Sequence, residues 1–326
     1  MDELDIYFDK NYAKLYEKIE NGKAYEFILE NEFGKITNLF LIREVPEKVN
    51  GKTYYDIVTP YGYGGPVIRE CNNKEQLLKS YEEEFSKFCK EHDIISEFIR
   101  FHPLVQNALD FKEIYNSIYM RNTLVTNLKD YDDPVQSQFS KSCRKNIRQA
   151  INKGITFKVT EKPENIGVFK EIYYSTMDRN NATDYYYFKD EYFENILKYF
   201  RDNVILVEAI YEGKTIAAGL YFVYNKTIHI HLSGTLTEYL YLSPAYILRY
   251  AVTLWGKEHG YETIHHGGGR SNSEEDTLYL FKRSFAKLEQ VDFYIGKKIW
   301  NEEIYNEECK IKNVDSNEAF FPAYRK

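Results

Sequence analysis

The fold of this chain is decided by the stretch Ile264-His265-His266-Gly267-Gly268-Gly269-Arg270 and by the residues that follow it to Phe285. A short strand that ends in three glycines lets the backbone approach another group closely, and the serine and acidic residues after the glycines can cap a helix. We therefore predict a strand at 262–266 and a helix at 274–286. Lys282 falls at the edge of the apolar face of that helix, where it can meet a substrate.

Periodic apolar positions extend this pattern over the second half of the chain. The predicted elements are, in order, a strand at 155–160, helices starting at 163 and spanning 190–200, strands at 204–211, 215–224 and 227–233, a helix at 243–260, the strand at 262–266, the helix at 274–286 and a strand at 290–295. Ser243 is the predicted N-cap of the helix that ends at Gly260, with Pro244 in its first turn. The first half has the same parts in the same order: strands at 25–30, 36–43 and 54–59, a helix at 73–92 and a strand at 94–101.

Length and composition limit the class of protein. The 326 residues exceed what one hydrophobic core usually supports, so we expect two domains. No apolar run is long enough to span a bilayer, and the first five residues lack the basic and apolar segments of a secretory signal, which together predict a soluble, cytoplasmic protein. The four cysteines are too widely spaced to indicate disulfides or a zinc ribbon. The net charge of −7 opposes nucleic-acid binding by the whole surface but not by a local basic patch.

The order of elements at 155–305 looks like the GNAT acyltransferase fold. That resemblance implies that the strands at 227–233 and 262–266 splay apart and that an acyl donor enters the gap. We predict a mixed α/β (α+β) fold with two tandem GNAT-like domains, each a mixed twisted sheet flanked by helices. The predicted domains are residues 1–133 and 155–326, the second with the active-site cleft, joined by a basic helix at 134–154.

Tandem domains joined by a helix with the pattern R-x-N-I-x-x-A-x-x-x-G, from Arg144 to Gly154, resemble the FemABX family over nearly the whole chain. The strand with its glycine triplet and the pair Phe281-Lys282 are the other matching motifs. Members of this bacterial family attach amino acids from aminoacyl-tRNA to cell-wall precursors, and relatives with the same architecture modify other glycans or small molecules. This chain lacks the long helical arm of some members, and His265-His266 precede the glycines where an acidic residue is more usual.

A glycine-rich loop and a basic helix are candidate binding sites. The loop at 61–65 follows a strand and precedes a helix, so its backbone N–H groups and tyrosines suit a phosphate or a sugar ring, although a tight turn would also need its glycines. Arg144 and Arg148 lie close to one face of the basic helix, where they can bind a phosphate-rich ligand or simply face solvent. The resemblance further implies that the segments around Arg179 and Tyr186 line the substrate cleft. The residues predicted to bind substrate are Tyr61, Gly62, Tyr63, Gly64, Gly65, Arg144, Arg148, Arg179, Tyr186, Gly268, Arg270 and Phe281.

The predicted function is transfer of an aminoacyl or acyl group to an amine of a cell-wall (peptidoglycan) or surface-glycan precursor. Lys282 is the candidate cation for the developing oxyanion or for acceptor phosphates, and His266 is the candidate for proton removal. We expect no metal, because the histidines at 229, 231, 265 and 266 lack a nearby carboxylate at ligand spacing.

We also expect no tightly bound cofactor, only a donor co-substrate. The segment 234–239 lacks the glycine-rich cradle expected for the coenzyme A pyrophosphate, which favours aminoacyl-tRNA over acyl-CoA and makes tRNA a candidate partner. Two alternatives stay open. One is an acyl-CoA-dependent GNAT N-acyltransferase acting on a small molecule or sugar, and the other is a non-catalytic glycan- or nucleotide-binding module.

Overall fold

The computed structural model describes residues 4–273 and 275–326. The chain forms two compact units: the first contains residues up to Arg121 together with Asp292–Lys326, and the second contains Asn122–Val291. Residues 1–3, on which the prediction about a secretory signal partly rests, lie outside the described part. The same is true of residue 274, where a helix was predicted to start. None of the helices in the described ranges has the length and apolar character needed to cross a bilayer.

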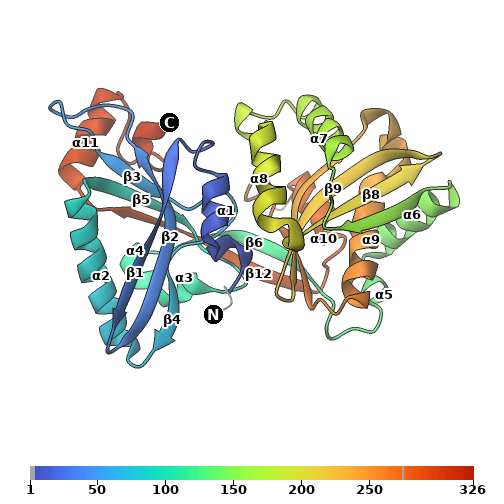
Figure 1. Cartoon of the computed structure of the whole chain (residues 1–326), viewed down its shortest axis with the longest axis horizontal. Coiled ribbons are helices and arrows are strands. Elements are labelled where there is room, and N and C mark those ends of the chain that lie inside the picture. The colour runs from blue at the N-terminus through green and yellow to red at the C-terminus, as the bar shows by residue number, and fades with distance from the viewer. Residues whose placement is uncertain (1–3, 274) are drawn as a thin grey trace. The chain divides into compact units, whose positions relative to one another are not determined.

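The first unit is a mixed sheet with one long helix packed on it (Figure 1). Its elements are η1 (Ile6–Phe8), α1 (Lys10–Leu15), β1 (Gly22–Asn31), β2 (Gly34–Glu44), β3 (Tyr55–Val58), β4 (Val67–Cys71), α2 (Lys74–Glu91), β5 (Ile94–Arg100), α3 (Asn107–Asp110), α4 (Lys112–Tyr115), α11 (Glu302–Ile311) and η5 (Ala323–Arg325). The strands run in the order β1-β2-β3-β5-β12, with β4 paired to β2. Strand β12 (Glu289–Ile299) belongs to this unit from Asp292 onward. Strands β3 and β5 are parallel, and the other neighbours in this series are antiparallel.

Aromatic side chains fill the core between α2 and this sheet. Asn73 caps α2 by accepting a hydrogen bond from the Gln76 backbone N–H. Helical spacing then places Tyr81, Phe85 and Phe88 on one buried face, where the rings of Tyr81 and Phe85 stack at 5.3 Å. The apolar stripe that predicted this helix is therefore its contact with the sheet.

The second unit is a sheet with helices on both faces (Figure 1). Its elements are β6 (Ile118–Asn127), α5 (Pro134–Gln138), α6 (Lys141–Asn152), β7 (Thr156–Glu161), α7 (Gly167–Arg179), η2 (Asp184–Tyr186), α8 (Asp190–Phe200), η3 (Arg201–Asn203), β8 (Val204–Tyr211), β9 (Lys214–Tyr224), β10 (Thr227–Thr235), η4 (Thr237–Leu242), α9 (Pro244–Glu258), β11 (Thr263–Gly267) and α10 (Thr277–Arg283). The strand order is β6-β11-β10-β9-β8-β7. The strands from β7 to β10 form an antiparallel meander, β11 is parallel to β10, and β6 is antiparallel to β11.

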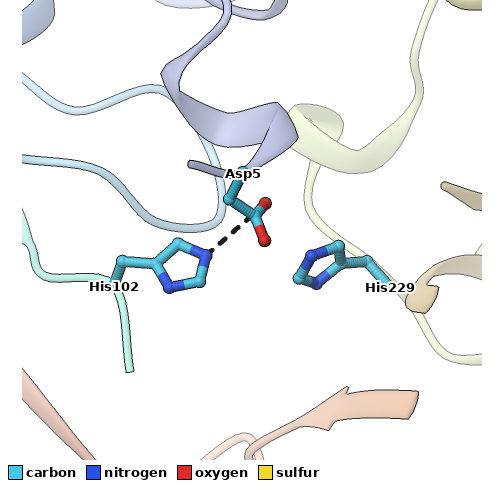
Figure 2. Close-up of side chains that lie close together, drawn as sticks. All are labelled: Asp5, His102 and His229. Atoms are coloured by element: carbon cyan, nitrogen blue, oxygen red, sulfur yellow. Dashed lines mark ion pairs between the residues drawn. The ribbon is translucent and has the colours of Figure 1, made fainter. Parts of the chain in front are cut away.

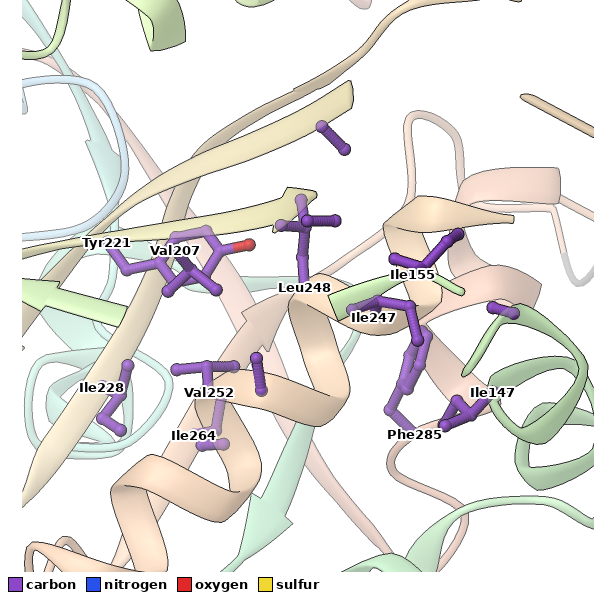
Figure 3. Close-up of a cluster of buried hydrophobic side chains, with 14 of the residues drawn as sticks. Ile147, Ile155, Val207, Tyr221, Ile228, Ile247, Leu248, Val252, Ile264 and Phe285 are labelled. Atoms are coloured by element: carbon purple, nitrogen blue, oxygen red, sulfur yellow. The ribbon is translucent and has the colours of Figure 1, made fainter. Parts of the chain in front are cut away.

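Helix α9 covers one face of this sheet and forms the core of the second unit. Its side chains Ile247, Leu248 and Val252 pack against Val207 of β8 and Tyr221 of β9 in one buried cluster (Figure 3). The alternation of strand side chains sends the neighbouring positions to the opposite face. There α8 and α7 pack against the sheet, with the Phe200 ring meeting Phe222 at 5.7 Å.

The strands β10 and β11 separate after a short parallel contact. They pair only from Thr227↔Thr263 to His229↔His265, after which β10 continues beside β9 and β11 continues beside β6. Both strands have a register irregularity at the point of separation. A bulge bends a strand and strengthens its twist, which turns the two strands away from each other. The splay implied by the GNAT resemblance is therefore present in the second unit.

The predicted mixed α/β fold is confirmed, but the predicted domain boundaries of 133, 154 and 155 differ from the units. The segment Asp292–Lys326, predicted to belong to the second domain, lies in the first unit, because β12 pairs with β5 and α11 packs against β5. The basic helix predicted to join the domains is α6, and it lies within the second unit, where Cys143 and Ile147 are buried in the α9 core. Contacts between segments far apart in the sequence decide where β12 and α6 belong. The local sequence of these elements does not indicate it.

One strand and two helix starts also differ from prediction. Strand β6 was not predicted, and its burial lacks the alternation that marks a half-buried strand: its first two residues are exposed, the next three are half-buried and most of its second half is buried. The helix predicted from residue 163 begins at Gly167, whose N–H donates to the Asn165 side chain. Ser243 stands at the N-cap of α9 as predicted, but its φ is +57° and its side chain makes no capping hydrogen bond.

Candidate functional site

Asp276 holds the glycine triplet against the start of α10. Its carboxylate accepts the backbone N–H of Tyr279 at 2.8 Å as the helix N-cap, and it also accepts the backbone N–H groups of Arg270 and Ser271 at 2.9 and 2.8 Å. Burial opposes the charged form, but these hydrogen bonds outweigh it and lower the pKa of Asp276 to about 2. The loop and the helix are therefore fastened together by one carboxylate.

The close approach explains the glycine at position 269. A Cβ atom there would lie 2.7 Å from a carboxylate oxygen of Asp276 and 3.0 Å from Cβ of Tyr279. Gly267, by contrast, has a φ of +70°, which glycine adopts without strain. The triplet does permit a close approach of its backbone, as predicted. The group that it approaches is the start of the protein's own helix α10.

Lys282 lies on α10 with its ammonium beside the glycine triplet. Its Nζ donates a hydrogen bond to the Gly268 carbonyl at 2.7 Å, and the side chain is half-buried. Phe281, the preceding residue, packs its ring against Tyr246 of α9 and Phe285 at 5.2 and 5.0 Å. The packing of Phe281 therefore anchors the helix, and it places the Lys282 ammonium beside the end of β11.

His266 is buried at the end of β11 and is held by Thr126 of β6. The Thr126 hydroxyl donates its one proton to the Phe285 carbonyl and therefore accepts from His266 Nε2, at 2.9 Å in each case. The imidazole proton is then on Nε2, and Nδ1 has no hydrogen-bond partner among the residues that the structure describes. Burial, together with the positive charges of Arg249 and Lys282, lowers the pKa of His266 well below its usual value.

The neutral imidazole has a bare lone pair, which a general base needs, but a low pKa makes it a weak base. The role of His266 in proton removal therefore stays a prediction. His231 lies on the neighbouring strand β10 and has different contacts: its Nε2 is 2.7 Å from the Tyr192 hydroxyl, and burial lowers its pKa to about 3.

Arg249 brings a second cation to the same place. It lies on α9 with 6% of its surface exposed, and its Nη1 donates to the hydroxyls of Tyr221 on β9 and Ser233 on β10. The sequence analysis did not identify this residue. The available signal was a charged side chain between Leu248 and Ala251, within an otherwise apolar helical stripe.

Arg179 of α7 forms hydrogen bonds at the C-terminal end of β10. Its Nη1 donates to the Thr235 carbonyl at 2.6 Å and to the Thr237 hydroxyl at 3.1 Å. The Tyr186 carbonyl accepts from the Tyr173 hydroxyl at 2.8 Å, while the Tyr186 ring is 37% exposed. These contacts hold backbone in place, and the predicted roles of Arg179 and Tyr186 in substrate binding stay predictions.

The two arginines of the basic helix α6 have different surroundings. Arg144 donates through Nη1 to the carbonyls of Gln136 and Phe139, so its guanidinium holds α5 against α6. Arg148 and Lys145 are exposed. Of these three side chains, Lys145 and Arg148 are available to a phosphate-rich ligand without loss of an internal contact, and Arg144 is not.

The loop of Tyr61, Gly62, Tyr63, Gly64 and Gly65 packs within the first unit. The Tyr12 hydroxyl donates to the carbonyl of Tyr61 at 2.8 Å, and the Tyr63 ring meets the rings of Tyr7 and His102 at 5.4 and 5.6 Å. Figure 2 shows His102 with its ion-pair partner Asp5, at 3.5 Å from Nε2 to Oδ1.

The backbone conformation and the close packing of this loop both require glycine. Gly62 and Gly65 have φ of +95° and +86°, and a Cβ atom would meet the Tyr7 ring and Ile99, respectively. Gly64 donates its N–H to the Arg100 carbonyl and accepts from Asn107. The turn therefore accounts for these glycines, and ligand binding at the loop stays a prediction.

Comparison with known proteins follows this geometry. The FemAB family model matches residues 108–212. A UDP-N-acetylmuramoylpentapeptide-lysine N(6)-alanyltransferase from Weissella viridescens is 22% identical over 236 residues, which cover 71% of this chain and 66% of that protein, just under two thirds of its length.

Solved structures share the fold across most of the chain. FemX matches with a TM-score of 0.68 and 15% identity, covering 93% of this chain and 94% of that one. The C-terminal domain of a putative lysylphosphatidylglycerol synthetase from Agrobacterium fabrum matches with a TM-score of 0.57 and 12% identity, covering 91% and 88%. L-PGS from Bacillus licheniformis matches with a TM-score of 0.56 and 12% identity, covering 90% and 93%. The chain resembles the FemABX family in sequence and in fold, so the resemblance predicted from its sequence is confirmed.

Proposed function

We propose that this protein is an aminoacyltransferase that joins an activated carboxyl group to an amine of a cell-wall precursor. The observation that carries the proposal is the Lys282 ammonium, fixed at the Gly268 carbonyl beside the point where β10 and β11 part. The FemX-like fold and the alanyltransferase of Weissella viridescens, whose name states a muramoylpentapeptide-lysine acceptor, support it.

The reaction requires stabilisation of negative charge on oxygen. The acceptor amine attacks the carbonyl carbon of an ester, the carbonyl oxygen becomes an oxyanion, and the ester oxygen then leaves as the amide forms. A positioned cation or N–H donor at the oxyanion lowers this barrier by about 3 to 4 kcal/mol. Lys282 has the charge and the partly buried position for this task, and Asp276 holds the loop that positions it.

The start of α9 favours an aminoacyl ester of tRNA over acyl-CoA as donor. A pyrophosphate cradle needs free backbone N–H groups before a helix. Here the Ser243 N–H donates to Leu240, Pro244 has none, and the Tyr246 N–H donates to Ser243. The exposed Lys145 and Arg148 of α6 supply a basic surface for the tRNA phosphates.

The test replaces Lys282 with methionine, which retains the apolar stem and removes the charge. Purified protein is incubated with UDP-N-acetylmuramoylpentapeptide and either alanyl-tRNA or acetyl-CoA, and the acylated product is measured by mass spectrometry. We expect product from alanyl-tRNA, and a fall in kcat of about 100-fold in Lys282→Met with KM little changed. Lys287→Met, which alters an exposed lysine beyond the same helix, should retain activity.

Other results would change the conclusion. Product from acetyl-CoA alone would indicate a coenzyme A-dependent N-acyltransferase. A raised KM with kcat preserved would make Lys282 an anchor for acceptor phosphates. Binding of the precursor without any product would favour a non-catalytic binding module, and full activity in Lys282→Met would remove this lysine from the site.

A further inference from the structure

Arg249 is a buried cation without an acidic partner in the part of the chain that the structure describes. Its side chain is 6% exposed, and its hydrogen bonds go to two neutral hydroxyls, those of Tyr221 and Ser233. Its guanidinium carbon lies 5.4 Å from the Tyr221 ring centroid. The Nε–H group is buried and has no hydrogen-bond partner among the described residues.

Such an arrangement is costly unless an anion completes it. Arginine is not deprotonated in proteins, so burial cannot be relieved by loss of the charge. Buried charges are almost always paired, and a buried N–H without an acceptor adds a further desolvation cost. Two neutral hydroxyls and one aromatic face leave the charge uncompensated.

The surroundings of Arg249 also favour an anion. Lys282 and Arg249 both act on His266 with positive charge, so two cations and a neutral imidazole gather within the second unit. Ser233 stands on β10 beyond His229, the last residue of that strand paired with β11. Ser233 is partly exposed, whereas Arg249 behind it is buried, so an oxyanion that reaches Ser233 comes next to the guanidinium.

We propose that Arg249 and the Ser233 hydroxyl form a binding subsite for an oxyanion, a carboxylate or a phosphate group, at the splay of β10 and β11. The Arg249 Nε–H donates to one anion oxygen and the Ser233 hydroxyl to another, and Arg249 supplies the counter-charge. Guanidinium groups bind both anions through charge-assisted hydrogen bonds. The subsite requires no transfer reaction and therefore does not depend on the proposed function.

The subsite can be tested by NMR of the full chain labelled with ¹⁵N-arginine. The Arg249 Nε–Hε signal is identified by its loss in Arg249→Met or, if that variant does not fold, in Arg249→Lys. Inorganic phosphate and acetate are then titrated separately at constant ionic strength, with sodium chloride as the reference salt. We expect the Arg249 signal to shift and saturate with at least one of the two anions, and the responding anion identifies the ligand class.

Affinity measured by calorimetry gives a second readout. In Arg249→Met the dissociation constant of the responding anion should rise about tenfold or more, as loss of a charge-assisted contact implies. Arg201→Met, which changes an exposed arginine of the same unit that is paired with Glu164, should leave it unchanged. An Arg249 signal that responds to neither anion beyond the chloride reference would overturn the subsite, as would equal affinity in Arg249→Met.

Discussion

Glu97 on β5 is a buried carboxyl group that makes the stability of the first unit depend on pH. It is 1% exposed, and Asn38 Nδ2 and Trp300 Nε1 each donate a hydrogen bond to one of its oxygens at 3.1 Å. Burial raises the pKa of Glu97 to about 7, because these hydrogen bonds only partly offset the lost hydration. The group therefore changes its charge in the physiological range.

We predict that the free energy of unfolding falls as the pH rises from about 4.5 to about 7. In this interval the folded state binds the Glu97 proton more tightly than the unfolded state does, so the stabilisation is fully present below the unfolded pKa and is lost as the pH passes the folded pKa. The full effect is on the order of 3 kcal/mol. Urea unfolding at about pH 5 and about pH 8, close to the lower end of this interval and just above its upper end, measures most of it.

Glu97→Gln should shrink the difference between the two pH values, because the amide cannot ionise. Glu84→Gln, an exposed carboxyl change on α2, serves as the control and should leave the difference unchanged. An undiminished pH dependence in Glu97→Gln would assign it to other groups.

At the scale of elements, two turns of the first unit, one before β4 and one between β2 and β3, contain glycines that are required for separable reasons. Gly62 has a φ of +95° and its Cβ position is occupied by the Tyr7 ring, while Gly51 has a φ of +79° and open space within 4 Å. Both positions favour glycine through backbone conformation, but only Gly62 is also sterically closed.

We therefore expect Gly62→Ala to destabilise the protein more than Gly51→Ala. A left-handed non-glycine residue costs about 1 kcal/mol, and displacement of the Tyr7 ring adds about 1 to 3 kcal/mol at position 62 only. Thermal unfolding of the two variants checks this. Equal melting temperatures would show that the Tyr7 ring moves aside freely, and the loop would then be open to a ligand.

At the scale of the whole molecule, the last residues of the chain are built into the first unit. Asp56 on β3 is fully buried and accepts hydrogen bonds from Arg43 Nε at 2.9 Å, from the Tyr324 hydroxyl at 3.1 Å and from Arg325 Nε. Tyr324 also contacts Ser96 on β5 at 2.7 Å. Residues more than 200 positions apart in the sequence thus share one charged network.

Removal of one cation from this network should destabilise the first unit selectively. We expect Arg325→Met to cost about 2 to 4 kcal/mol, because a buried carboxylate loses one of its partners. Lys326→Met removes only an exposed ion pair with Glu318 and should cost less than about 1 kcal/mol. Hydrogen exchange reports the location, with faster exchange in β3 and β5 of Arg325→Met and unchanged exchange in β8 and β9. Acceleration in both units would instead show that they unfold together.

The candidate site was predictable in part. The glycine triplet and Lys282 are close in sequence, so local spacing singled them out together, and in the structure the Lys282 ammonium donates a hydrogen bond to the Gly268 carbonyl. Thr126 could not be identified in this way, because it meets His266 only after strands distant in sequence have paired. For Arg249 the only local signal was a charge within an apolar helical stripe, and its influence on His266 comes from the tertiary fold. Asp276 was read as part of an acidic helix start, and the structure makes it the cap that holds the triplet.

The sequence by itself determined the elements whose signals are local. The hairpin of β8 and β9 and the helix Asp190–Phe200 follow from side-chain periodicity and turn residues, which act within a few positions of the chain. Only the tertiary structure decided that β12 joins β5, that α6 lies in the α9 core and that Arg249 is buried with no acidic partner among residues 4–273 and 275–326. These outcomes depend on hydrogen bonds and burial between segments far apart in sequence, where the free energy of pairing overrides local preference.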